Sequence, residues 1–181
     1  MVIRFSDQVA RKRLAVHDLS FAALALITGL AWLGCCASAA AEVSIDKAAP
    51  SLSLRQLDGQ TFDLAKFRGK VVLIHYWATW CAPCKKEMPI LDAFYRRYHE
   101  RGLELIGISA DQPQDFAKMR RMSSMFSYPA ATLNDITQNG FGPPEGFPLT
   151  YVVDGNGIVR DKFIDLHERL LRDVVLPLLA H

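Results

Sequence analysis

The sequence contains few cysteines and carries little net charge. Only four of its 181 residues are cysteine, and the formal net charge is +2. A charge balance this close to zero argues against nucleic acid as a partner. The chain also has no internal repeat and no low-complexity tract. What is present, 50% hydrophobic and 22% charged residues, is typical of a soluble globular protein with one ordinary domain and a short extension.

Residues 1–41 have the order of a secretory signal peptide. A basic stretch comes first, an almost uninterrupted apolar run follows at 19–36, and an alanine-rich segment ends it. Cleavage after Ala39 or Ala41 fits this order. Two alternatives stay open: an uncleaved membrane anchor, because the apolar run approaches the ~18–20 residues that span a bilayer, and lipidation at Cys35. All three place the rest of the chain outside the cytoplasm, and we expect it in the periplasm.

Beyond that segment the chain keeps two cysteines, Cys81 and Cys84. A disulfide that stabilises a secreted domain usually closes a long loop, because a longer loop restricts the unfolded chain more. A loop this short adds little, so the pair is predicted to serve chemistry. Half of a zinc site is the alternative, but it needs two further ligands at metal-like spacing, and His99, His167 and His181 are scattered. We therefore expect no metal and no other cofactor.

Hydrophobic periodicity and turn residues predict one domain at 49–181, after a polar linker at 42–48. The predicted strands comprise an N-terminal hairpin over 51–63, two buried strands at 71–77 and 103–109, a weak strand or loop at 130–133, and a terminal hairpin of 149–153 and 158–164. The predicted helices run from Pro83 to Gly102, from 113 to 125 with Asp111 as cap, and from 166 to 179. Residues 134–146 are rich in Asn, Gly and Pro and are expected to form a loop. The predicted fold is α/β, a central mixed sheet flanked by helices with an added N-terminal hairpin.

The cysteine pair lies where the first buried strand passes into the first helix, and a Cys-x-x-Cys in such a unit is typical of a redox site. At a helix N-terminus, unpaired N–H groups and the helix dipole favour a thiolate over a thiol. Cys81 is therefore the predicted nucleophile. Cys84, one turn further and less exposed, is predicted to resolve the mixed disulfide. The same steps run in reverse oxidise a substrate, so the motif predicts the reaction and leaves its direction open.

Residues 77–89 (WATWCAPCKKEMP) resemble the active-site segment of the TlpA/ResA/DsbE group of thioredoxin-like proteins. The similarity extends over about residues 49–178. It includes the Ala-Pro at its start, the Gly-Lys before the first buried strand and the segment FPLTYVVD at 147–154. The resemblance implies a thioredoxin-like fold and dithiol–disulfide exchange between the two cysteines.

The same resemblance assigns substrate-facing roles to three residues. Pro148 matches a cis-proline that faces the disulfide, since X-Pro bonds tolerate the cis form; an ordinary loop proline is the alternative. The bend presents the backbone of Phe147 to an extended substrate, and Phe147 replaces the small residue or Thr often found there. Trp80, next to Cys81, is expected to shape the substrate-contact surface, with plain packing as the alternative.

Two titratable residues accompany the pair. Glu87 lies three residues after Cys84, on the same side of the helix, and relatives resembling ResA carry a functional Glu here. It is expected to accept a proton from Cys84 or to tune the pair, and a solvated helix charge is the alternative. His75 occupies the strand position where thioredoxins carry a buried Asp and this group often carries Asn. We expect a buried, hydrogen-bonded structural histidine there, and the alternative is a titratable imidazole that makes activity pH-dependent.

The resemblance implies a monomeric reductase of protein substrates with cysteine pairs, recharged by a membrane electron donor of DsbD/CcdA type. Its clients would be haem-binding cysteine pairs in cytochrome c maturation or copper-site cysteines in oxidase assembly, and the residues do not choose between them. Two other functions are alternatives. A peroxiredoxin-like peroxidase needs a peroxidatic Cys within a loop containing Pro and Thr. A Sco-like copper chaperone uses Cys-x-x-x-Cys with a distant His, and the spacing here fits neither.

Overall fold

The computed structural model describes residues 43–179, so the predicted signal segment lies outside the described residues. The strands are β1 (Leu52–Arg55), β2 (Thr61–Asp63), β3 (Val71–Trp77), β4 (Leu103–Ser109), β5 (Ala130–Thr132), β6 (Ile136–Asn139), β7 (Leu149–Val153) and β8 (Val159–Phe163). The helices are α2 (Ala82–Tyr98), α3 (Phe116–Ser123) and a C-terminal helix made of α4 (Glu168–Leu170), a π-helical turn (Leu171–Val175) and α5 (Leu176–Leu178). Short 3₁₀ turns lie at Leu64–Phe67, His99–Arg101, Pro113–Asp115 and Leu133–Asp135. Within 43–179 no helix has both the length and the apolar character to cross a bilayer.

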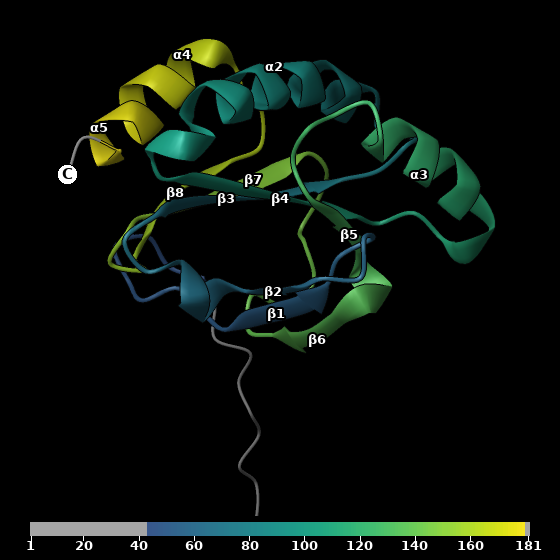
Figure 1. The fold of residues 1–181 in the computed structure, drawn as a ribbon, viewed down its shortest axis with the longest axis horizontal. Coiled ribbons are helices and arrows are strands. Elements are labelled where there is room, and N and C mark those ends of the chain that lie inside the picture. Colours follow the sequence, from purple (N-terminus) through teal and green to yellow (C-terminus); the bar gives the residue numbers. More distant parts are fainter. Residues whose placement is uncertain (1–42, 180–181) are drawn as a thin grey trace, which may run out of the picture. The chain divides into compact units, whose positions relative to one another are not determined.

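A five-stranded sheet with β3 at its centre organises the domain, in the order β5-β4-β3-β7-β8 (Figure 1). β3 and β4 are parallel, as are β4 and β5, whereas β7 is antiparallel to both β3 and β8. Every residue of β3 and β4 is buried. Layers cover both faces of these central strands, which explains their nearly continuous apolar sequences. The predicted central mixed sheet is confirmed.

Different layers cover the two faces of this sheet (Figure 1). Helices α2, α4 and α5 lie over one face, where Leu91 packs in a core cluster with Leu73 of β3. β1, β2 and β6 form a three-stranded antiparallel sheet over the other face. There Leu54 and Phe62 belong to a second core cluster with Ile74 of β3. The alternating side chains of β3 therefore join both cores, which fixes the strand that leads into the cysteine pair.

The N-terminal hairpin has a third strand that the sequence did not indicate. β1 pairs with β2, as expected from the Asp-Gly turn between them, and it also pairs with β6. The expectation of a loop over 134–146 is wrong at residues 136–139. Three of the four β6 side chains are exposed and polar, because β6 is the outer strand of the small sheet. An edge strand of this kind lacks the apolar alternation that would reveal it.

The helix that follows β4 begins later than the sequence predicts. Pro113–Asp115 is a 3₁₀ turn with Gln112 at its N-cap, and α3 starts only at Phe116. The prediction that Asp111 caps this helix is wrong. Its carboxylate instead accepts hydrogen bonds from residues at the ends of β3 and β4. This places the carboxylate next to the segment that precedes the cysteines.

The chain before β1 and the terminal hairpin are joined by backbone hydrogen bonds. The N–H of Asp46 donates to the carbonyl of Val159 (2.7 Å), and the N–H of Ala49 donates to that of Gly157 (2.8 Å). Gly157 has a φ of +71° in the turn between β7 and β8, a conformation that glycine adopts without a steric penalty. The antiparallel pairing of β7 with β8 confirms the predicted terminal hairpin.

Candidate active site

Cys81 and Cys84 form a disulfide at the first turn of α2. Cys81 is the N-cap residue of this helix, and its Sγ accepts a hydrogen bond from the N–H of Cys84 (3.2 Å). Pro83 lies in the first turn, where a helix needs no N–H donor. Cys81 is 4% exposed and Cys84 0%. The predicted position of the pair, between a central strand and a helix start, is confirmed.

This position determines what the pair does once it is reduced. The Cys81 sulfur lies where the helix dipole and an N–H group both stabilise negative charge. A thiolate is the form that attacks a disulfide. Both cysteines belong to a core cluster with Trp77, Met88 and Met119, and Cys84 is the more deeply buried of the two. The geometry suits an attacking sulfur at Cys81 and an enclosed second sulfur at Cys84.

Aromatic side chains border the disulfide on the side of the loop before β7. The peptide bond between Phe147 and Pro148 is cis, as the resemblance implies. The rings of Trp80 and Phe147 meet edge to face, with centroids 5.6 Å apart. Trp80 is nevertheless 62% exposed, so most of its ring faces solvent. A groove of about 510 Å³ adjoins this surface, lined by Pro83 and Glu87 of α2 and by the cis-proline loop. The role of this surface in substrate contact stays a prediction.

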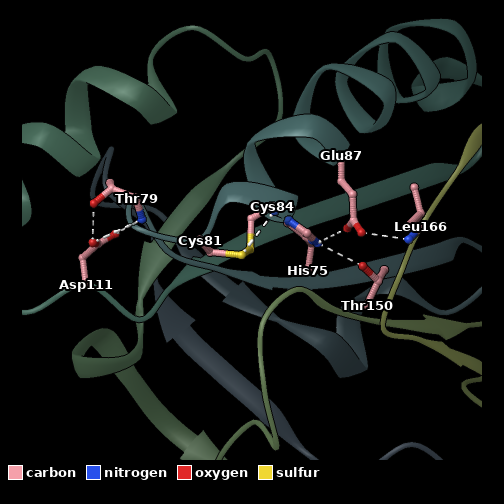
Figure 2. The surroundings of a disulfide bond; sticks show 8 residues. All are labelled: His75, Thr79, Cys81, Cys84, Glu87, Asp111, Thr150 and Leu166. Carbon is pink, nitrogen blue, oxygen red and sulfur yellow. Dashed lines mark hydrogen bonds and ion pairs between the residues drawn. A yellow bond between two sulfur atoms is a disulfide. The ribbon is translucent and has the colours of Figure 1, made fainter.

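A buried polar cluster made of His75, Glu87, Thr150 and Leu166, hereafter the His75 cluster, lies on one side of the disulfide (Figure 2). His75 Nδ1 is 2.9 Å from Thr150 Oγ1 and 4.0 Å from Glu87 Oε2. Glu87 Oε1 accepts the N–H of Leu166 (2.8 Å). Two buried atoms of the cluster, His75 Nε2 and Glu87 Oε2, have no hydrogen-bond partner among the described residues. The alternative that Glu87 is a solvated helix charge is therefore wrong, since Glu87 is 3% exposed.

Burial sets the charges of this cluster. It lowers the pKa of His75 to about 3, so the imidazole is neutral at neutral pH. Burial also raises the pKa of Glu87 to about 7, opposed by the Leu166 N–H and assisted by the charge of Asp165. His75 and Glu87 are therefore not an ion pair at neutral pH, although their side chains face each other. The prediction of a buried, hydrogen-bonded His75 is confirmed.

A second buried polar cluster is made of Thr79, Ser109 and Asp111 and is called the Asp111 cluster hereafter. Figure 2 shows Thr79 and Asp111 on the other side of the disulfide. The Asp111 carboxylate accepts the backbone N–H of Thr79 (2.9 Å), the Thr79 hydroxyl (2.6 Å) and the Ser109 hydroxyl (2.7 Å). These bonds hold the backbone two residues before Cys81. Asp111 therefore positions the loop that leads from β3 into Cys81.

The sequence interpretation missed Thr79 and Ser109 as site residues. A signal was present, because the two residues follow or end neighbouring parallel strands, β3 and β4. The carboxyl ends of parallel strands meet at one edge of a sheet, which is where polar side chains converge. Of the histidines considered as zinc ligands, His99 lies near Glu104 on the far end of α2 and His167 near the start of α4. Among residues 43–179 no group of three His, Cys, Asp or Glu side chains is placed to hold a metal ion.

Comparisons with known proteins agree with this geometry. Residues 45–162 match the AhpC/TSA family. The chain is 31% identical over 123 residues to the thiol-disulfide oxidoreductase ResA of Bacillus cereus, a match that covers 68% of this chain and 71% of the relative.

Two solved structures share the fold at lower identity. A thiol:disulfide interchange protein of the thioredoxin family from Chlorobium tepidum superposes with a TM-score of 0.59 at 23% identity, over 73% of this chain and 98% of that one. A secreted thiol-disulfide isomerase from Corynebacterium glutamicum superposes with a TM-score of 0.63 at 24% identity, over 74% of this chain and 86% of that one. With a cysteine pair at a helix start, a cis-proline loop beside it and these matches, the chain belongs to the AhpC/TSA family and is a thiol–disulfide oxidoreductase of the TlpA/ResA/DsbE group.

Proposed function

We propose that this oxidoreductase works in the periplasm as a reductant of disulfides in protein substrates. The thiolate of Cys81 attacks one sulfur of a substrate disulfide, which breaks, and a mixed disulfide forms between Cys81 and the substrate. Cys84, as a thiolate, then attacks the Cys81 sulfur, and the second substrate thiolate leaves. Two electrons pass from the dithiol to the substrate, and the Cys81–Cys84 disulfide remains.

The observation that carries this proposal is the place of Cys81 at the N-cap of α2, where its sulfur accepts the N–H of Cys84. This arrangement supports the division of roles, because the first sulfur is stabilised as an anion and the second is enclosed. The exposed ring of Trp80 and the cis-proline loop provide a surface for an extended polypeptide beside the first sulfur. The catalytic residues proposed are therefore Cys81 and Cys84, with Trp80, Phe147 and Pro148 in contact with the substrate.

The direction of electron flow and the location rest on resemblance and on the N-terminal sequence. The basic, apolar and alanine-rich order of residues 1–41 supports export, by a cleaved signal or an anchored one. By resemblance, the disulfide is reduced again by a membrane electron donor of DsbD/CcdA type. The proposed clients are haem-binding cysteine pairs in cytochrome c maturation or cysteines of copper sites, and the protein is proposed to act as a monomer without nucleic acid.

The reduction potential of the pair tests the direction. Equilibration of the purified protein with dithiothreitol or glutathione buffers, read out by thiol labelling, gives this potential directly. A value near that of thioredoxin, about −270 mV, supports a reductant. A value near that of DsbA, about −120 mV, identifies an oxidant and overturns the proposed direction. A Cys81→Ser variant is the control for labelling that does not come from the pair.

The clients can be identified by trapping. A Cys84→Ala variant forms the mixed disulfide and cannot resolve it, so a substrate stays attached to Cys81. We expect exported proteins with cysteine pairs to be trapped, and a Cys81→Ser, Cys84→Ala double variant to trap none of them. Capture of cytoplasmic proteins alone, from cells that express the full chain, would contradict the proposed location.

A further inference from the structure

The two atoms without partners in the His75 cluster lie beside the reactive cysteines. His75 Nε2 and Glu87 Oε2 are both buried and make no hydrogen bond with any described residue. Proteins seldom leave buried polar atoms unpaired, because such atoms give up water without compensation. The nearby Asp92, a buried carboxylate on the same helix, has partners for both oxygens in Ser127 and Arg96. The open oxygen of Glu87 is thus a particular feature of this site.

The positions of the cluster residues connect it to the reaction. Glu87 lies three residues after Cys84 in α2, a spacing that brings two side chains to the same side of a helix, about 5–6 Å apart at Cβ. His75 lies in β3, six positions before Cys81, and it pairs in register with Thr150 of β7. Thr150 in turn follows the cis-proline by two residues. The cluster therefore draws on α2, which carries Cys84, and on β3 and β7, the strands that lead into the cysteine loop and out of the cis-proline loop.

The neighbours of Glu87 keep its proton exchangeable near neutral pH. The groups around it are the neutral imidazole of His75 from β3, the Leu166 N–H and Asp165 carboxylate from the segment after β8, and Cys84 three residues earlier on its own helix. The Thr150 hydroxyl of β7 contacts His75 Nδ1. Lys86 lines the same groove. Burial raises the pKa of Glu87 to about 7, and a group whose pKa lies near the working pH transfers protons efficiently.

Relying on the proposed role of Cys84 as the resolving cysteine, we propose that His75 is a positioning residue of the resolving step. Its uncharged ring, held by Thr150, shields Glu87 Oε2 from water and denies it a cationic partner, so that this oxygen accepts the Cys84 proton. The S–H bond of Cys84 breaks as an O–H bond forms on Glu87. The new thiolate attacks Cys81, and the Cys81–substrate bond breaks. The substrate leaves as a thiolate, takes a proton from solvent, and Glu87 returns its own proton to the groove.

The test measures the resolving step alone. Reduced protein reacts with excess oxidised glutathione, and release of the second glutathione is timed between pH 5 and pH 9 in wild type and variants. The wild type is expected to show an inflection near pH 7. Glu87→Gln is expected to remove the inflection and to slow the step at pH 7 by about tenfold or more. Asp92→Asn, which changes the fully partnered carboxylate, is the matched control and keeps the inflection in place.

Two variants of His75 test whether its ring acts by shielding Glu87 from water. His75→Ala admits water to Glu87, so the inflection is expected to fall by about one pH unit or more towards that of a solvated carboxyl. His75→Phe keeps the ring volume, so the inflection is expected to stay near pH 7 or to rise. If His75→Ala does not fold by circular dichroism, the comparison of His75→Phe with wild type and Glu87→Gln decides the matter.

An unchanged inflection in His75→Ala, a lowered one in His75→Phe, or a wild-type inflection that survives Glu87→Gln would overturn the inference. These failures leave the proposed function intact, since glutathione release by the wild type shows dithiol exchange in any case. Absence of glutathione release by the wild type would instead refute the resolving role of Cys84 on which the inference rests.

Discussion

The two buried polar clusters beside the disulfide have opposite bonding. In the Asp111 cluster both carboxylate oxygens accept hydrogen bonds, from Thr79 and from Ser109. In the His75 cluster one carboxylate oxygen and one ring nitrogen remain without partners among the described residues. Figure 2 shows the disulfide between Thr79 and Asp111 on one side and His75 and Glu87 on the other. A saturated cluster fixes backbone, whereas an unsaturated one is free to change its protonation.

The difference follows from the energetics of buried polar groups. Hydrogen bonds to a charged acceptor contribute about 1.5–3 kcal/mol each, and an unpaired buried group gives up about 1–3 kcal/mol. The Asp111 cluster therefore contributes to stability. The His75 cluster reduces stability, because its unpaired atoms are buried. The same burial raises the pKa of the Glu87 carboxyl group to about 7. The comparison leads to three predictions: the first two alter one cluster each, and the third compares matched substitutions in both.

The largest effect is expected from Asp111→Ala. The substitution leaves the Thr79 N–H and two hydroxyl groups buried without an acceptor. We expect the free energy of unfolding of the oxidised protein to fall by about 3–5 kcal/mol, measured by urea denaturation. Asp111→Asn keeps one acceptor oxygen and is expected to lose clearly less. A loss below about 1 kcal/mol for the alanine variant would show that the cluster does not hold this backbone.

A change of comparable size but opposite sign is expected from Glu87→Gln at high pH. The folded protein holds the Glu87 proton up to about pH 7 and the unfolded chain only to about 4.5, so stability from this group falls as pH rises through that window. His75 acts in the reverse sense, because its pKa is about 3 when folded and 6.5 when unfolded, and stability falls as pH drops through that range.

Glu87→Gln removes only the first of these two dependences. We therefore expect the difference in unfolding free energy between variant and wild type to grow by about 3 kcal/mol in favour of the variant from pH 4.5 to pH 8.5. Urea denaturation at several pH values measures it. Gln still offers an oxygen to the Leu166 N–H, so that bond does not contribute to the difference. Parallel stability curves for the two proteins would mean that Glu87 ionises as freely when folded as when unfolded.

The smallest effect is expected from a pair of matched substitutions, Thr79→Val and Thr150→Val. Each replaces a buried hydroxyl with a methyl group of similar size. The Thr79 hydroxyl donates to a carboxylate and the Thr150 hydroxyl contacts a neutral imidazole. We expect losses of about 1.5–3 kcal/mol for the first and about 0.5–1.5 kcal/mol for the second. Equal losses would remove the energetic contrast between the clusters.

Local patterns predicted the parts of the fold and site whose signal lies within a few residues of sequence. These local signals are the Cys-x-x-Cys spacing, the long apolar runs of β3 and β4, and the Asp-Gly turns. The redox pair, the buried strands and the hairpins that they predict agree with the structure. Local physical patterns did not suffice to predict the cis bond at Pro148. That prediction came from the resemblance to a known group.

Features that depend on contacts between distant segments were not predictable in this way. Glu87 is buried because Leu166, 79 positions further along the chain, covers it and donates to it. The sequence predicts a helix cap at Asp111 because nothing local reveals its actual partner, Thr79, which lies two residues beyond another strand. β6 forms because its backbone pairs with the free edge of β1. The polar side chains of β6 do not themselves indicate a strand. In each case the tertiary arrangement overrides a reasonable local reading.

The most direct test of the account is to find which cysteine reacts first. Reduced protein is treated at pH 7 with less than one equivalent of iodoacetamide, and the modified cysteine is identified by mass spectrometry. Cys81 lies at the helix start, where its sulfur accepts an N–H, and Cys84 is fully buried. We therefore expect nearly all of the label on Cys81, and none faster than background in a Cys81→Ser variant. Label that falls equally on both cysteines, or first on Cys84, would contradict the assignment of nucleophile and resolving thiol.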